Sequence, residues 1–284
     1  MRAVLFSILV LVLSTGCETF ARRLAYTTVP SAAMRGVWME YAIYAPDDLR
    51  EDEHLPLVVF LHGGGDGPDC LDRAGLGVAL DEAMRAGTVP RAVIVVPEGD
   101  LGFWANWYDG SRHYEDWVMD ELVPRVATAM HTLPCPDGCH LMGVSMGAEG
   151  ALRFAVHRPG SFRSITSISG PAFDTDRRIA FVNDPLMNIF IPTWHVFGPP
   201  RPRRRIEADD PFLVWNDAED LRGARLYLTW GTEDRDFVRT GGSAFDAHLT
   251  AHGIPHHTQE YAGGHGWIWW RPVILEALSA QLAP

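Results

Sequence analysis

The chain contains no lysine, and all 24 of its basic residues are arginines. This absence excludes several chemistries, because a P-loop, a pyridoxal phosphate Schiff base and a Ser-x-x-Lys acylase each need a lysine. The sequence also has no Gly-x-Gly-x-x-Gly motif that opens a helix, so nothing in it indicates a dinucleotide cofactor. We therefore expect an activity that needs no organic cofactor.

Positive charge is also scarce, since 24 basic residues face 36 acidic ones and the formal net charge is −12. An acidic chain repels phosphate backbones, which argues against nucleic acid as a partner. The one basic run is PRPRRR at residues 200–205. We interpret it as a solvated loop, with a docking patch for an anion or a membrane surface as the alternative.

The first residues, MRAVLFSILVLVLSTGC, have the pattern of a secretory signal. Arg2 precedes an apolar stretch at 4–13 that is too short to span a membrane. Because a cysteine follows the small residues, residues 1–17 resemble a bacterial lipoprotein signal. We expect export to the periplasm or cell surface and lipidation of Cys17 as the membrane anchor, with an ordinary signal peptide as the alternative. Residues 18–36 would then be an N-terminal tether.

The chain has four cysteines, and an exported protein can form disulfides. Cys135 and Cys139 flank Pro-Asp-Gly, a turn that favours a local bridge between them. A metal site is the weaker interpretation, because no second ligand pair stands at metal spacing. Cys70 would remain as a small buried residue.

Residues 37–284 alternate between predicted strands and helices, without an internal linker. Predicted strands cover 38–46, 55–65, 92–100, 140–145, 164–169, 225–231 and 256–262, and predicted helices cover 114–130, 147–156, 242–252 and 273–282. Continuous Val- and Ile-rich runs suit strands buried on both faces. The pattern predicts one α/β domain, a mostly parallel sheet with helices on both faces. Residues 171–222 interrupt it and predict an insertion over the carboxyl edge of the sheet, where α/β proteins keep their sites.

Ser145 stands in Gly-Val-Ser-Met-Gly, between a predicted strand and a predicted helix. A sharp turn there strains the serine, and the small Gly143 and Gly147 relieve the crowding. The motif alone is weak evidence, so partners are needed. His265, in the glycine-rich loop AGGHGW, is the candidate base. Asp234, directly after a strand, is the candidate acid that orients the base, with Glu233, Asp236 and Asp174 as alternatives.

Backbone donors for an oxyanion are also available. Leu61–Gly65 reads LHGGG after an apolar strand, and its glycines can expose N–H groups. Gly63 or Gly64 would supply one donor, and the N–H of Met146, next to the candidate nucleophile, would supply the other. A plain turn is the alternative, and in either case we expect His62 to support the loop.

These motifs follow the chain order Ser, Asp, His of α/β-hydrolases. The segments LPLVVFLHGGG, VIVVPEGD, YEDWVMDELVPRV, GVSMGAEGALRFAVHRPG, GTED and GGHGW resemble the putative-esterase family of α/β-hydrolases, which includes feruloyl esterases and mycolyltransferases. The resemblance implies the α/β-hydrolase fold, with Ser145 as nucleophile, His265 as base and Asp234 as acid. The insertion has no match in it.

Tryptophan and tyrosine side chains are expected near this site. Trp104, Trp107 and Tyr108 follow a predicted strand, and Trp267 follows His265. We expect them to line the pocket, which would favour an aromatic or sugar-linked ester as substrate. The sequence thus predicts an exported serine esterase without metal or cofactor. The alternatives are an acyltransferase, a peptidase or a non-catalytic surface binding protein.

Overall fold

The computed structural model describes residues 22–186, 189, 191, 193–198 and 203–283. The expected signal peptide and Cys17 lie outside the described residues. Within those ranges, no helix is both long enough and apolar enough to cross a membrane.

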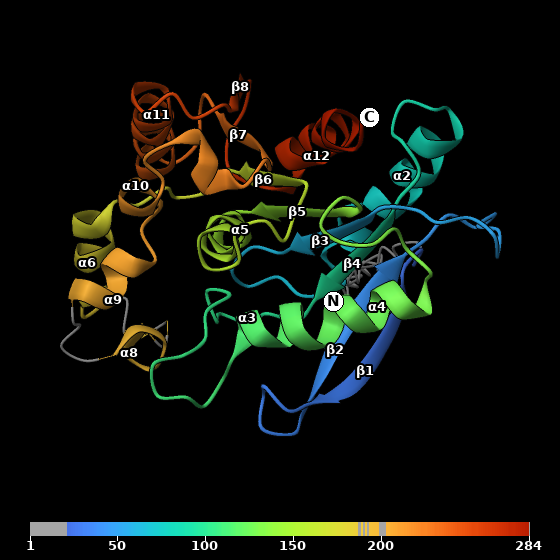
Figure 1. The fold of residues 1–284 in the computed structure, drawn as a ribbon, viewed down its shortest axis with the longest axis horizontal. Coiled ribbons are helices and arrows are strands. Elements are labelled where there is room, and N and C mark those ends of the chain that lie inside the picture. The colour runs from blue at the N-terminus through green and yellow to red at the C-terminus, as the bar shows by residue number, and fades with distance from the viewer. Residues whose placement is uncertain (1–21, 187–188, 190, 192, 199–202, 284) are drawn as a thin grey trace, which may run out of the picture.

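An eight-stranded sheet forms the centre of the molecule (Figure 1). Its strands are β1 (Ala25–Ser31), β2 (Val37–Tyr44), β3 (Leu57–Leu61), β4 (Val93–Pro97), β5 (Cys139–Val144), β6 (Ser164–Ile168), β7 (Arg225–Gly231) and β8 (His257–Tyr261). They are arranged in the order β1-β2-β4-β3-β5-β6-β7-β8. The pairs β1–β2 and β2–β4 are antiparallel, and all the others are parallel. The expected mostly parallel α/β sheet is confirmed.

The central strands are buried on both faces, as their continuous apolar sequences predict. Every residue of β3, LVVFL, is buried. Because successive side chains of a strand point to opposite faces, Leu57 and Val59 enter one hydrophobic core and Val58 and Phe60 enter the other. Each face therefore needs its own cover of helices.

Helices cover both faces of the sheet. They are α1 (Cys70–Arg73), α2 (Leu76–Arg85), α3 (Tyr114–Asp116), the π-helical η1 (Trp117–Leu122), α4 (Val123–Ala129), α5 (Met146–His157), α6 (Thr175–Asn183), α8 (Thr193–Phe197), α9 (Arg203–Ala208), α10 (Pro211–Val214), the 3₁₀-helical η2 (Ala218–Leu221), α11 (Asp236–Ala251) and α12 (Trp267–Leu282). Trp117 of η1, Phe154 of α5 and Phe245 of α11 belong to one core. Leu80 of α2 and Ile274 of α12 belong to the other. Figure 1 shows α2 and α12 on one side of the sheet and α3, α4 and α5 on the other.

The described residues of the segment 171–222 include short helices that gather at one end of the molecule, at the left of Figure 1. Buried charges attach it to α5. Arg178 of α6 donates to Glu149 at 2.6 Å, and Asp209 lies 3.2 Å from Arg153 and 2.9 Å from His157. We call these five residues the ionic cluster. It fixes the position of the insertion relative to α5, the helix that directly follows Ser145.

The prediction that residues 18–36 form a tether is wrong for the larger part of this range. Residues 25–31 form β1, which pairs with β2, and the backbone N–H of Arg23 donates to Asp72 at 3.0 Å. The sequence does not reveal β1 because the strand lies at the edge of the sheet and most of its side chains are exposed or half-buried, so it has no continuous apolar run.

Two helices begin earlier than the sequence predicts. Helix α11 starts at Asp236 instead of residue 242, and α12 starts at Trp267 instead of residue 273. Pro272 lies inside α12, and a proline removes one helical hydrogen bond, here to the carbonyl of Ile268. Because Ile268 is highly exposed, solvent can hydrate that carbonyl.

Candidate active site

Ser145 occupies the sharp turn between β5 and α5. Its φ of 54° and ψ of −117° are strained for a residue with a side chain. Its N–H donates to the carbonyl of Ile168 on the neighbouring strand at 2.9 Å, which holds the turn in place. The serine therefore sits directly before the first amide of α5, where the helix dipole favours negative charge.

Two glycines make this turn possible. A Cβ at Gly147 would collide with the carbonyl oxygen of Leu61, and a Cβ at Gly143 would collide with the carbonyl oxygen of Gly147. Strand β5, the turn and α5 thus approach one another more closely than any residue with a side chain allows.

His265 links Ser145 to Asp234 by hydrogen bonds. Its Nε2 lies 2.9 Å from Oγ of Ser145, and its Nδ1 lies 2.7 Å from Oδ1 of Asp234. The imidazole is largely buried and the side chain of Asp234 is fully buried. Three residues that are 31 and 120 positions apart in the chain meet with the geometry of a nucleophile, a base and a carboxylate that orients the base.

The carboxylate of Asp234 is held in its ionised form. Burial alone would raise the pKa of Asp234, but hydrogen bonds with His265 and Ser169 outweigh burial and lower this pKa below its usual range. The other acidic candidates have different contacts. Asp174 caps α6 by accepting from the N–H of Arg177, and Asp236 pairs with Arg239 at 2.8 Å.

Ser169 is a buried member of this network that the sequence analysis did not identify. Its Oγ donates to Oδ2 of Asp234 at 2.6 Å and accepts from Nε1 of Trp270 at 2.9 Å. The hydroxyl of Tyr261 lies 2.7 Å from the same Oγ and donates to the carbonyl of Gly264, next to His265, at 3.0 Å. Only its place at the end of a predicted strand could have marked Ser169.

The glycine-rich loop after β3 borders the serine. A Cβ at Gly63 would lie 3.4 Å from Cβ of Ser145, and a Cβ at Gly64 would lie 3.8 Å from Sδ of Met146. The N–H of Met146 is the first of α5, and such amides have no partner within their helix. The loop and the start of α5 thus both lie close to Ser145.

His62 supports this loop, as expected from the sequence. It is fully buried, and its Nε2 accepts from the N–H of Gly99 at 3.1 Å. Nδ1 then carries the proton and donates to the carbonyl of Gly63 at 2.8 Å. The ring thereby fixes the peptide that precedes Gly64.

A family model described as "Putative esterase" matches residues 31–280 of the chain. The chain belongs to the putative esterase family. Esterase Rv1288 of Mycobacterium tuberculosis is 29% identical to this esterase-family chain over 265 residues, which cover 85% of the chain and 56% of the relative. The chain therefore spans little more than half the length of that curated protein.

Solved structures of the same fold include known hydrolases. FphF, a fluorophosphonate-binding serine hydrolase of Staphylococcus aureus, aligns with a TM-score of 0.77 at 19% identity, over 93% of this chain and 100% of that one. A ferulic acid esterase aligns with a TM-score of 0.74 at 18% identity, over 91% and 97% of the two chains. These likenesses confirm the α/β-hydrolase fold.

The expectation that Trp104 lines the pocket of this esterase-family member is wrong. Trp104 is fully buried beneath the glycine-rich loop, where its Nε1 donates to the carbonyl of His62 at 3.2 Å. Its indole occupies the space that a Cβ at Gly150 would need, so it packs between the loop and α5. Pocket-lining and supporting tryptophans look alike in a sequence, because both follow a strand end.

The other three predicted pocket aromatics have different positions. Trp107 is partly buried and lines a cleft beside the glycine-rich loop. Tyr108 is half exposed and packs instead on the insertion, with the guanidinium of Arg205 over its ring at 5.1 Å. Trp267 donates from Nε1 to Asp66, another residue of the cleft, at 3.2 Å. Of the four, Trp107 lies in the cleft wall and Trp267 contacts it.

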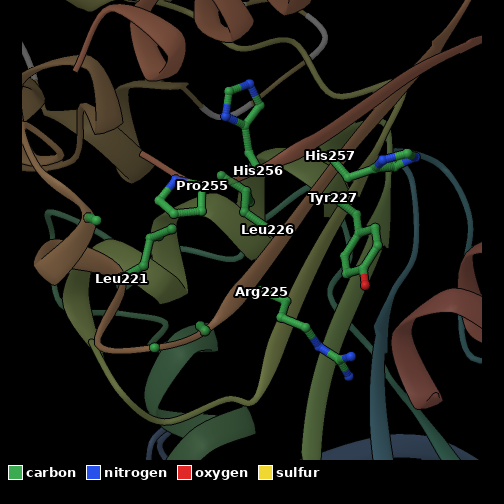
Figure 2. Close-up of a pocket in the computed structure, with 10 residues that line it drawn as sticks. Leu221, Arg225, Leu226, Tyr227, Pro255, His256 and His257 are labelled. Atoms are coloured by element: carbon green, nitrogen blue, oxygen red, sulfur yellow. The ribbon is translucent and has the colours of Figure 1, made fainter. Parts of the chain in front are cut away.

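A second hollow of about 360 Å³ lies at the amino ends of β7 and β8, away from the strand ends that carry the serine and the acid (Figure 2). Two of its charged or titratable side chains are bound by other groups of the protein. Arg225 donates to the carbonyls of Gln281 and Ala283, and both ring nitrogens of His256 are engaged. We assign no function to this hollow.

The structure joins Cys135 and Cys139 in a disulfide and leaves Cys70 as a buried thiol. Burial raises the pKa of Cys70, which keeps the thiol protonated and unreactive. Across the described ranges, no group of three or more His, Cys, Asp and Glu side chains is placed to hold a metal ion.

Proposed function

We propose that the chain is a serine hydrolase that cleaves carboxylic esters through Ser145, His265 and Asp234. The observation that carries this proposal is the pair of hydrogen bonds at 2.9 and 2.7 Å through the two nitrogens of His265. Membership of the putative esterase family supports it.

The proposed reaction has two halves. His265 takes the proton of Ser145 Oγ as the oxygen attacks the ester carbonyl, and the N–H groups of Met146 and of Gly63 or Gly64 stabilise the oxyanion. His265 then gives its proton to the departing alcohol, which leaves an acyl-enzyme. Water, activated by the same imidazole, releases the acid, while Asp234 offsets the charge of the imidazolium.

The test is a panel of model esters, with Ser145→Ala as the control. We expect hydrolysis by the wild type and a loss of at least about 10³-fold in kcat for the variant, because the residual rate comes from binding and the oxyanion donors alone. A fluorophosphonate probe should label the wild type and not the variant. An unlabelled, folded wild type would favour the binding-protein alternative, and product formed on an added alcohol in preference to water would favour acyl transfer.

For the substrate, we propose an aromatic or sugar-linked ester. The partly buried Trp107 in the cleft supports this class, and so does the fold shared with a ferulic acid esterase. A feruloyl ester should then have a higher kcat/KM than the corresponding acetate, and equal values would contradict the proposal.

We also propose that the protein is exported and anchored to a bacterial membrane through a lipid on Cys17. The charged start, short apolar stretch and following cysteine of residues 1–17 support it. In cells that express the full chain, the wild type should partition into detergent and Cys17→Ser should not. A Cys17→Ser protein that remains in the detergent phase would refute the lipid anchor.

A further inference from the structure

A cleft of about 880 Å³ opens beside the glycine-rich loop. Gly65 of that loop and Leu101 line the cleft, and a Cβ at Gly64 would lie 3.3 Å from Cδ2 of Leu101. Trp107, Arg35 and Arg112 also line the cleft. The cleft therefore lies next to the loop that borders Ser145, and two guanidinium groups line it.

Arg35 stands in the turn between β1 and β2, and the protein holds that turn firmly. Met34 is buried, and the N–H of Ala33 donates to Oε1 of Glu121 on η1 at 2.8 Å. Arg35 itself has a φ of 55°, a conformation that costs a residue with a side chain about 1 kcal/mol or more. The turn thus keeps a long cationic side chain at the cleft wall.

Arg112 lies on another segment of the cleft wall, near a buried tyrosine. Burial and the hydrogen bond from Tyr114 to Asp100 raise the pKa of Tyr114, and the positive charge of Arg112 opposes that rise. The side chain of Arg112 is half-buried. A half-buried cation loses hydration, so an anionic partner at this point is worth more than one on the open surface.

The acidic groups of the cleft already have partners. Asp66 pairs with Arg73 at 2.8 Å, and Asp109 pairs with His195 at 2.9 Å. Asp100 accepts from the Tyr114 hydroxyl at 2.7 Å. In contrast, neither Arg35 nor Arg112 has a hydrogen bond or ion pair from its side chain to another described residue. The guanidinium groups of Arg35 and Arg112 are therefore available to bind an anion, although the chain as a whole has a net charge of −12.

Resting on the proposed esterase function, we propose that this cleft selects esters that carry a carboxylate. The carboxylate contacts Arg35 and Arg112 at the far end of the cleft, while the ester group lies at Ser145 and the intervening part of the substrate packs on Trp107. Arginine suits this role because its planar guanidinium binds a carboxylate through two parallel hydrogen bonds.

The experiment uses two pairs of elongated esters with the same shape. In one pair the alcohol side carries the charge: the acetyl ester of 4′-hydroxybiphenyl-4-carboxylate and the corresponding carboxamide. In the other the acyl side carries it: methyl 4-carboxycinnamate and methyl 4-carbamoylcinnamate. The readout is the ratio of kcat/KM between the anionic and the neutral ester, in which losses common to both esters cancel.

We expect the wild type to prefer the anionic ester by about 10-fold in at least one pair, and that pair identifies the side of the ester that enters the cleft. Arg35→Gln and Arg112→Gln should each reduce the ratio about 3-fold, and the double variant should remove the preference. Added salt should weaken the preference in the wild type. Arg85→Gln, at the end of α2 on the other face of the sheet, is the matched control and should keep the wild-type ratio.

Two outcomes would overturn the proposal: ratios within 2-fold of one for both pairs in the wild type, or a preference that survives in the double variant. Both outcomes differ from the result expected if the protein is not an esterase. If it is not an esterase, the wild type would hydrolyse neither the neutral nor the anionic esters faster than Ser145→Ala does.

Discussion

At the scale of single residues, Ser169 has the contacts of a positioning group. It donates to Asp234 and accepts from Trp270, and it belongs to the network that also holds Gly264 beside His265. The donated hydrogen bond contributes to the lowered pKa of Asp234. Without it, this pKa should rise and the carboxylate should orient His265 less well.

We therefore expect Ser169→Ala to lower kcat about 10-fold with little change in KM, and to move the acidic limb of the pH–rate profile to higher pH. Ser164→Ala is the matched control, because Ser164 is a buried serine at the other end of β6 that bonds to His140. If the two variants have the same pH–rate profile, Ser169 has only a structural role.

Some residues of the site could be predicted from the sequence because their neighbours in the chain mark them, and others could not. Ser145 and His265 stand among glycines that their turns require, so the neighbours mark them. Trp104 and Ser169 act through contacts with distant segments, and no local pattern distinguishes a tryptophan under a loop from one beside a substrate. Long-range contacts of this kind require the fold.

At the scale of elements, the ionic cluster connects α5 to the insertion. Glu149 accepts from Arg178 at 2.6 Å and from Arg153 at 3.3 Å, and all three side chains are buried. Removing one charge from such a group leaves the others uncompensated in a poorly solvated environment.

Glu149→Gln should therefore lower the free energy of unfolding by about 3 kcal/mol, measured by urea denaturation at pH 7. Glu207→Gln is the matched control, because Glu207 forms an exposed ion pair with Arg203 and its loss should cost less than about 1 kcal/mol. Equal effects of the two substitutions would show that the cluster contributes no more than a surface pair.

Elements were predictable where one segment carries its own evidence. Strand β3 reads as a buried strand because all five residues are apolar, and α4 follows from apolar residues at helical spacing. Strand β1 is held by its pairing with β2, which its largely polar and exposed sequence does not predict. The insertion was located by the break in the pattern, but its contacts with α5 depend on charges that are 29 to 56 positions apart.

At the scale of the whole molecule, His157 couples stability to pH. Burial lowers the pKa of His157, but hydrogen bonds with Asp209 and Glu115 outweigh burial and raise it to about 9. A histidine whose pKa is higher in the folded state stabilises the fold fully below its usual pKa of 6.5, and this contribution disappears as the pH rises through about 9.

As the pH increases from 6.5 to 9, the free energy of unfolding of the wild type should thus fall relative to that of His157→Gln. Solvent reduces the size of this change, because the His157 side chain is 32% exposed. Urea midpoints of both proteins at several pH values measure the difference. Parallel curves across this range would contradict the assignment.

The early start of the folded domain has a consequence for where the protein can act. Arg23 is fixed to Asp72 and to the carbonyl of Ala45, directly before the first strand. If Cys17 carries the proposed lipid, only six peptide steps separate the membrane from that fixed point, a reach of about 20 Å at full extension. The domain would then stay at the bilayer surface. Its substrates would have to be present in that thin layer, and polymers attached farther away would be inaccessible until released.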